Sequence, residues 1–144
     1  MEGHVMEDIF PVRVLPTVDR QNRRFWTSGE EGRLCIERCT DCGAWIHPPT
    51  GICSSCHSSS VEPTVVSGRG TIYSFTVNHQ PWFGDIGPYC VVLVDLEEGS
   101  AAQPLRITSN LVGTDPDDVA IGMPVEVFFV RCDDVWLPQF REIR

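Results

Sequence analysis

The sequence contains no lysine. All eleven of its basic residues are arginine, against twenty acidic residues, and the formal net charge is −9 at pH 7. A chain with this charge repels the phosphate backbone of a nucleic acid unless its arginines cluster, and residues 20–24 are the one basic stretch. The composition therefore argues against nucleic acid as a partner.

Long apolar runs are also missing. No run of eighteen apolar residues occurs, so we expect no membrane-spanning helix and no membrane partner. The N-terminus lacks the basic and then apolar pattern of a secretory signal peptide. We therefore expect a cytoplasmic protein in a reducing compartment, where clustered cysteines bind metals more often than they form disulfides.

Four of the seven cysteines lie within residues 39–56, as the pairs Cys39/Cys42 and Cys53/Cys56. Each CxxC turn brings two thiolates to one side of an ion, and two such turns complete the tetrahedral ligand set that zinc prefers. A glycine directly after Cys42 lets the first turn close tightly. The spacing predicts a four-thiolate zinc site in a ribbon of short strands, with iron as the alternative metal.

The role predicted for this metal is structural, because four thiolates leave no open coordination position. A structural zinc supplies about 10–16 kcal/mol of apparent binding free energy, whereas a small domain is stable by about 5–15 kcal/mol. A ribbon with almost no apolar core should therefore unfold without its metal. Cys35, His47 and His57 are less favoured substitute ligands, and His57 stands where a glycine would make the second turn more regular.

A short helix is expected over residues 17–31, with Thr17 or Asp19 as its cap and Gly29 or Gly32 at its end. Its apolar content is too small for it to stand alone, so Phe25 and Trp26 must pack on this chain or on a partner. Short strands near 34–38 and 44–47 should flank the first cysteine pair.

Beyond residue 64 the pattern changes to strands of period two. We expect five strands, with Tyr73, Phe75 and Val77 on one face of the first; the strands cover residues 70–78, 89–96, 103–110, 123–130 and 135–143. Five short antiparallel strands must close or be covered, which favours an OB-type barrel over a sandwich or an SH3-like barrel. The predicted fold class is mainly β: an extended segment over 1–16, a helix and zinc ribbon over 17–62, and an OB barrel over 63–144.

The loop at residues 79–88 places Trp82 and Phe83 beside Gly84 and Gly87 and away from any strand alternation. Large aromatic side chains on such a loop often mark a contact surface, although Trp82 could equally cap the end of the barrel. Together with Phe25 and Trp26 they are the predicted residues for contact with a partner or with an acyl-CoA. No catalytic residue is predicted, since His79 and Asp85 are more typical of turn caps than of an acid–base pair.

Cys90 and Cys132 are two further candidate nucleophiles. Cys90 lies in an apolar strand and is expected in the core. Cys132 precedes two aspartates, which should raise its pKa and lower its reactivity.

Several segments taken together resemble a known family; they are the FW helix, GRLCIERCTDCGAWIHPP, CSSC, GRGTIYSFTVNH, PYCVVLVDLEEG, GMPVEVFF and LPQFR. Their order is similar to that of the acyl-CoA-associated family called domain of unknown function thirty-five, in which a rubredoxin-like zinc ribbon precedes an OB fold. The resemblance covers residues 17–141.

The resemblance implies a partner of thiolase-superfamily enzymes acting on coenzyme A thioesters. These include thiolases and the lipid-transfer-protein-type aldolases of steroid side-chain degradation. The absence of lysine is typical of a GC-rich genome, such as that of an actinobacterium, and so weakly favours the steroid aldolases. The metal ligands carry over onto the four paired cysteines, and a heterotetramer with the partner is expected. Some relatives are fused behind a hydratase domain, so this chain is either a fragment of such a fusion or a separate subunit.

We therefore expect a non-catalytic accessory subunit, with the chemistry supplied by the partner. Three other functions stay open on the sequence alone: a single-stranded nucleic-acid binder, a stand-alone acyl-CoA thioester hydrolase and a rubredoxin-type electron carrier.

Overall fold

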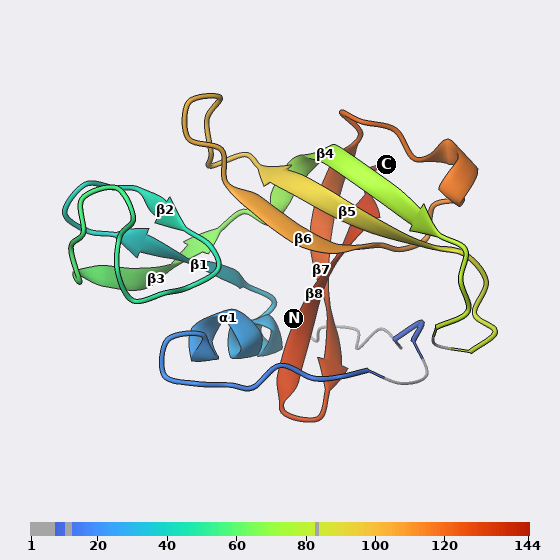
Figure 1. Ribbon diagram of the computed structural model, residues 1–144, viewed down its shortest axis with the longest axis horizontal. Helices are drawn as coiled ribbons and strands as arrows, with labels where there is room; N and C mark the ends of the chain where they lie inside the picture. Colours follow the sequence, from blue (N-terminus) through green and yellow to red (C-terminus); the bar gives the residue numbers. More distant parts are fainter. Residues whose placement is uncertain (1–7, 11–12, 83) are drawn as a thin grey trace.

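The computed structural model describes residues 8–10, 13–82 and 84–144 (Figure 1). It contains one short α-helix, two 3₁₀ turns and eight strands in these described residues. In chain order they are α1 (Arg23–Thr27), η1 (Ser28–Glu31), β1 (Leu34–Cys39), β2 (Trp45–Ile46), β3 (Val61–Val66), β4 (Arg69–Asn78), β5 (Tyr89–Leu96), β6 (Arg106–Leu111), η2 (Pro116–Asp118), β7 (Pro124–Cys132) and β8 (Val135–Glu142).

The predicted fold class is confirmed. Strands β4 to β8 form a closed five-stranded barrel in the order β4-β5-β6-β8-β7, and β2, β1 and β3 form a separate three-stranded sheet. Figure 1 shows the small sheet beside the barrel, with α1 between the sheet and β8. None of the helices among the described residues is long and apolar enough to cross a membrane.

The main core fills the barrel. Along β5 every second residue is buried, from Cys90 to Leu96, which is the period-two alternation of a strand with one face inward. Phe140 of β8 and Val125 of β7 meet this face and are fully buried. The zinc ribbon has a much smaller cluster of its own, formed by Cys39, Ala44, Ile46 and Cys53.

The face predicted for β4 is wrong at Tyr73. The pairing of β4 with β5 shifts between Ile72 and Ser74, which is a β-bulge. Before the bulge Ile72 is the buried residue and Tyr73 is 47% exposed, whereas beyond it Phe75 packs against the core. An extra residue in one strand reverses which side chains point inward, and simple alternation does not reveal it.

The helix is shorter than the predicted range of 17–31. Asp19 does act as a cap, but of a turn: its Oδ1 accepts hydrogen bonds from the backbone N–H groups of Gln21 and Asn22, both at 2.8 Å. The helix begins only at Arg23, and Gly32 ends the following 3₁₀ turn with a φ of 70°. A short polar side chain that bonds its own backbone competes with helix at this point.

Strand β3 was not predicted. It pairs along its whole length with β1, from Leu34↔Val66 to Cys39↔Val61, and crosses the expected boundary between residues 62 and 63. The sequence of β3 shows no clear alternation, because it contains Pro63 and most of its side chains are not buried. Both features are typical of an edge strand.

Candidate metal centre and docking surface

The four paired cysteines meet in one cluster. Their sulfur atoms all lie within 4.8 Å of one another, with Cys39 and Cys56 at 3.6 Å and Cys42 and Cys53 at 3.6 Å. Four sulfurs at the ordinary zinc–sulfur distance of 2.3 Å stand about 3.8 Å apart in a regular tetrahedron. The residues present therefore fit a tetrahedral zinc ion or an iron ion of similar size.

Each cysteine pair sits on a tight backbone turn. The N–H of Gly43 donates to the carbonyl of Cys39 at 2.9 Å, and the N–H of His57 donates to the carbonyl of Cys53 at 2.9 Å. Gly43 has a φ of 79°, which suits glycine, whereas His57 adopts a φ of 63° with a full side chain. The second turn is thus the less relaxed of the two, as the sequence suggests.

The backbone around the cluster favours thiolates. The N–H of Cys56 points at Cys53 and lowers the pKa of that thiol to about 6, and the N–H of Cys42 likewise lowers the pKa of Cys39. The N–H of Ser58 favours the Cys56 thiolate, but the neighbouring Cys39 sulfur and burial together raise the pKa of Cys56 to about 12. Four sulfurs this close ionise together only around a cation, so the donor set is that of a metal site.

Neither His47 nor Cys35 joins this cluster. Cys35 is buried in β1, and the His47 ring lies 4.8 Å from the ring of Phe25. Burial lowers the pKa of His47 to about 4, and its Nδ1 atom is buried with no hydrogen-bond partner among the described residues. Among these residues the metal-ligand group consists of the four paired cysteines.

The four aromatic residues predicted for contact lie in different environments. Phe25 is only 7% exposed and packs within its own chain, edge to face with Trp26 at 4.7 Å between ring centroids. Trp26 is partly buried, and Trp82 is 73% exposed on the loop between β4 and β5. Phe83 lies outside the described residues. Figure 1 shows α1 well away from the loop between β4 and β5, so the helix and this loop do not form one surface.

A groove lies where the ribbon meets the barrel. Its cavity of about 670 Å³ is bounded by the α1 residues Phe25 and Trp26, by the loop residues 47–49 of the ribbon, and by the outer faces of β5, β6 and β8. We call it the seam groove, and its barrel wall is made by Leu93, Arg106, Thr108, Ser109, Asn110, Leu137, Pro138 and Gln139.

Gln139 gives the seam groove an unusual polar group. The side chain is 4% exposed, and its Oε1 atom has no hydrogen-bond partner among the described residues. Sequence reasoning missed this residue and the neighbouring Pro138. The available signal was a proline and a glutamine inside the otherwise apolar strand VWLPQF.

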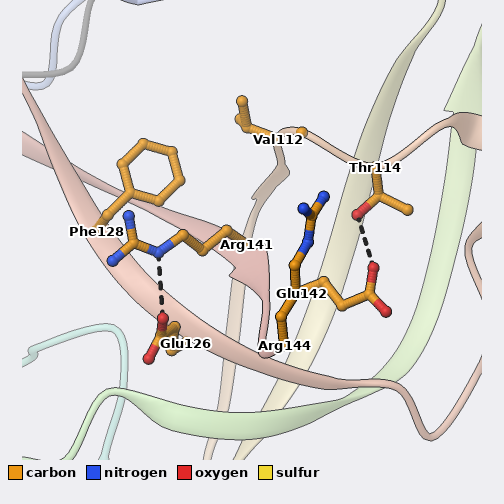
Figure 2. A pocket seen from close by; sticks show the side chains of 8 residues that line it. Val112, Thr114, Glu126, Phe128, Arg141, Glu142 and Arg144 are labelled. Carbon is orange, nitrogen blue, oxygen red and sulfur yellow. Dashed lines mark hydrogen bonds and ion pairs between the residues drawn. The ribbon is translucent and has the colours of Figure 1, made fainter.

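A second, smaller cavity of about 380 Å³ lies against β7 and β8 (Figure 2). Its charged groups are largely paired within the chain: Arg141 donates to Glu126 at 3.2 Å, and Thr114 donates to Glu142 at 3.5 Å. These pairs leave little unsatisfied polarity for a ligand, so the seam groove is the better candidate site.

The thiols of Cys90 and Cys132 are not activated. Burial raises the pKa of Cys90, which is 3% exposed as expected for the core. Burial and then the Asp8 carboxylate raise the pKa of Cys132, and Asp133 adds to this as the sequence suggests. Both thiols are therefore mostly protonated near neutral pH and are poor nucleophiles.

Two family descriptions match the chain in the order in which the structure places the parts. The family "ChsH2, rubredoxin-like zinc ribbon domain" matches residues 26–62, and the family "ChsH2, C-terminal OB-fold domain" matches residues 64–130. A solved chain of the "Ltp2-ChsH2(DUF35) aldolase" superposes with a TM-score of 0.75 at 36% identity, covering 89% of this chain and 98% of that one.

Two curated relatives differ in length. A "DUF35 domain-containing scaffold protein" of Methanocaldococcus jannaschii is 36% identical over 78% of this chain and 79% of the relative. The "3-oxo-4,17-pregnadiene-20-carboxyl-CoA hydratase alpha subunit" of Mycobacterium tuberculosis is 36% identical over 90% of this chain. This chain spans only 40% of the length of that hydratase subunit.

Proposed function

The chain belongs to the DUF35 family, and from that premise we propose that it binds and stabilises a thiolase-superfamily enzyme. The enzyme is an aldolase or a thiolase that acts on coenzyme A thioesters. In this proposal the chain itself supplies no catalytic residue, and the partner performs the chemistry.

One observation carries the proposal. The solved chain that this protein matches over 98% of its length, at 36% identity, is named for a complex of Ltp2 with a DUF35 subunit that forms an aldolase. The match includes both the ribbon and the barrel, so the surfaces available for a partner have the same framework. This similarity supports a subunit role better than a stand-alone enzyme.

The metal has a structural task in the proposed complex. Cys39, Cys42, Cys53 and Cys56 hold zinc, which ties the two turns of the ribbon together. The ribbon in turn positions the loop residues 47–49 against α1 and the barrel, where they form one wall of the seam groove. The zinc therefore fixes the shape of a contact surface.

We propose that aromatic side chains of this chain contact the partner enzyme. Trp82 is largely exposed, and Trp26 lines the seam groove. Aromatic side chains that become buried on association contribute strongly to interfaces. We assign Trp26, Trp82 and Phe83 to contact with the partner or its acyl-CoA, and Phe25 to holding Trp26 in place.

The substrate class and assembly complete the proposal. The name of the Mycobacterium tuberculosis relative refers to a steroid-derived acyl-CoA, which supports steroid or other lipid degradation as the setting. A heterotetramer of two chains with two partner subunits is proposed, in a reducing cytoplasm that keeps the thiolates available for zinc.

Co-expression tests this function. The untagged product of each neighbouring gene with a thiolase fold is expressed together with the tagged chain, and the purified complex is sized by light scattering. One product is expected to co-purify in a fixed ratio and to show acyl-CoA turnover that falls when the chain is left out. If no such product binds, or if the chain alone turns over acyl-CoA, the proposal is overturned.

A further inference from the structure

The barrel is closed between β6 and β8 by very little backbone pairing. The two strands run parallel and share a single bridge, Leu111↔Phe140, with Val112 N–H donating to Phe140 at 2.9 Å. Pro138 lies two residues before Phe140 in β8, and as a proline it has no N–H to donate. Its carbonyl accepts instead from the Ser109 hydroxyl at 2.7 Å. Backbone pairing between the two strands therefore does not continue towards the start of β6, and residues of both strands line the seam groove.

Because this pairing is so limited, one backbone edge of β6 faces the groove. Leu96 N–H donates to Leu105 at 2.8 Å, so by the alternation of an antiparallel ladder the odd-numbered residues of β6 bond to β5. The N–H and C=O groups of Arg106 and Thr108 then point the other way, towards the groove. Within the described part of the chain, β8 does not pair with either residue.

The side chains around this edge also favour an occupant. The buried amide of Gln139 has an unpaired oxygen at the groove, and leaving such an atom unsatisfied is costly. Apolar contact is offered by Trp26, Pro48 and Leu137. Among the described residues that line the groove, the charged ones are Arg13, which pairs with Asp8, and Arg106, which pairs with Asp95 at 2.7 Å, so the unmet polar groups are those of the backbone edge and of Gln139.

From these observations we infer that the seam groove binds an extended segment of a partner polypeptide, which pairs with the free edge of β6. A peptide backbone repeats donors and acceptors at the strand spacing that Arg106 and Thr108 present, and a peptide group satisfies the Gln139 amide. Apolar side chains of the segment pack on Trp26 and Leu137. A segment of about five residues covers the edge.

The identity of the partner rests on the proposed function, but the binding mode does not. The groove can therefore be tested without the enzyme. A displayed library of random dodecapeptides is selected on the full, zinc-loaded chain, and the recovered sequence is synthesised. Its dissociation constant is measured for the wild type and for three variants.

Thr108→Pro removes the outward N–H and leaves the ladder with β5 intact, because that N–H does not bond to β5. Thr108→Val is the matched control, since it keeps the backbone and loses only the hydroxyl. We expect peptide binding about tenfold weaker in Thr108→Pro and within about twofold of wild type in Thr108→Val. Hydrogen exchange should show the Arg106 and Thr108 amides becoming protected when the peptide binds.

Gln139→Leu separates a binding role from a structural one. If Gln139 served only the fold, the substitution would lower the melting temperature of the protein. Removing an unsatisfied buried amide should instead leave the melting temperature equal or higher, while peptide affinity falls about tenfold. This variant and the exchange measurement decide the question even if Thr108→Pro does not fold.

Several outcomes would overturn the inference. They are recovery of no binding peptide, equal binding by all variants, or pantetheine binding at the groove with an affinity that Thr108→Pro leaves unchanged. The last outcome would make the groove a small-molecule site. If a peptide binds the groove but no thiolase-fold partner is found, only the proposed function is refuted. If a thiolase-fold partner binds Thr108→Pro as well as the wild type and no peptide is recovered, only the peptide-binding role of the groove is refuted.

Discussion

The Oε2 atom of Glu37 lies 3.0 Å from the backbone nitrogen of Thr50 and accepts a hydrogen bond from its N–H. The same oxygen accepts from Gly51 at 3.3 Å. Glu37 is buried in β1, two residues before Cys39, and the loop that it holds leads to Cys53. One carboxylate therefore fixes the two cysteine pairs relative to each other.

Replacing Glu37 by leucine should destabilise the ribbon. The substitution leaves two backbone N–H groups without their charged acceptor, which costs about 1.5–3 kcal/mol. Urea unfolding followed by circular dichroism should show this loss, and competition with a chelator should show weaker zinc binding. Glu62→Leu, at an exposed site on β3, is the control and should change stability by less than about 0.5 kcal/mol. Equal effects of the two substitutions would contradict the assigned role.

Metal removal should unfold the ribbon before the barrel. The ribbon's own core consists of four buried residues, two of them cysteine ligands, and a structural metal supplies about 10–16 kcal/mol. We expect one zinc per chain by plasma mass spectrometry, with loss of that zinc in Cys53→Ser and full retention in Cys132→Ser. Hydrogen exchange after chelation should rise in residues 34–66 first. Barrel strands that exchange equally fast would show that the two parts unfold together.

Ser28 and Gly29 should respond in opposite directions. A Cβ atom on Gly29 would lie 2.5 Å from both Phe129 and Trp136, so Gly29→Ala should destabilise by about 1–3 kcal/mol. Ser28 is 1% exposed, and its hydroxyl has no partner among the described residues. Ser28→Ala should therefore be neutral or stabilise by about 1 kcal/mol. Melting temperatures of the two variants measured side by side decide this.

Acid should weaken the fold through His47. Its pKa is lowered to about 4 by burial, from 6.5 in an unfolded chain, so the unfolded state binds the proton first as pH falls. The free energy of unfolding should drop by about 2 kcal/mol between pH 8 and 5, and by about 3 kcal/mol at pH 4.

His47→Leu isolates this effect, because the variant keeps the same thiolates and cannot titrate at this position. The stability difference between His47→Leu and the wild type should grow between pH 6.5 and 4 and stay constant above pH 7.5. A difference that does not change with pH would show that His47 is protonated in the folded chain as easily as in the unfolded one.

The zinc site and the barrel were predictable from sequence because local patterns specify them. Two CxxC pairs fix four ligands by spacing alone, and the near-continuous apolar run at 89–96 indicates a central strand. The observed β5 has those bounds, and the cysteine sulfurs meet as expected.

The features that were missed depend on contacts between distant residues. The bulge before Ser74 follows from pairing with β5, and β3 exists because β1 offers it an edge. The seam groove depends on Pro138 meeting Ser109 across 29 residues of sequence. A proline in a strand signals a break in pairing, but the partner at which the break occurs becomes visible only in three dimensions.

Pro48 and Pro49 stand between the two cysteine pairs in sequence, and in space they form a wall of the seam groove. Ligation of the ion and occupation of the groove are therefore coupled equilibria. Any factor by which the bound ion raises the affinity for an occupant is, by reciprocity, the factor by which the occupant raises the affinity for the ion. When zinc is scarce, the free chain would then give up its ion before the chain that is bound to its partner does.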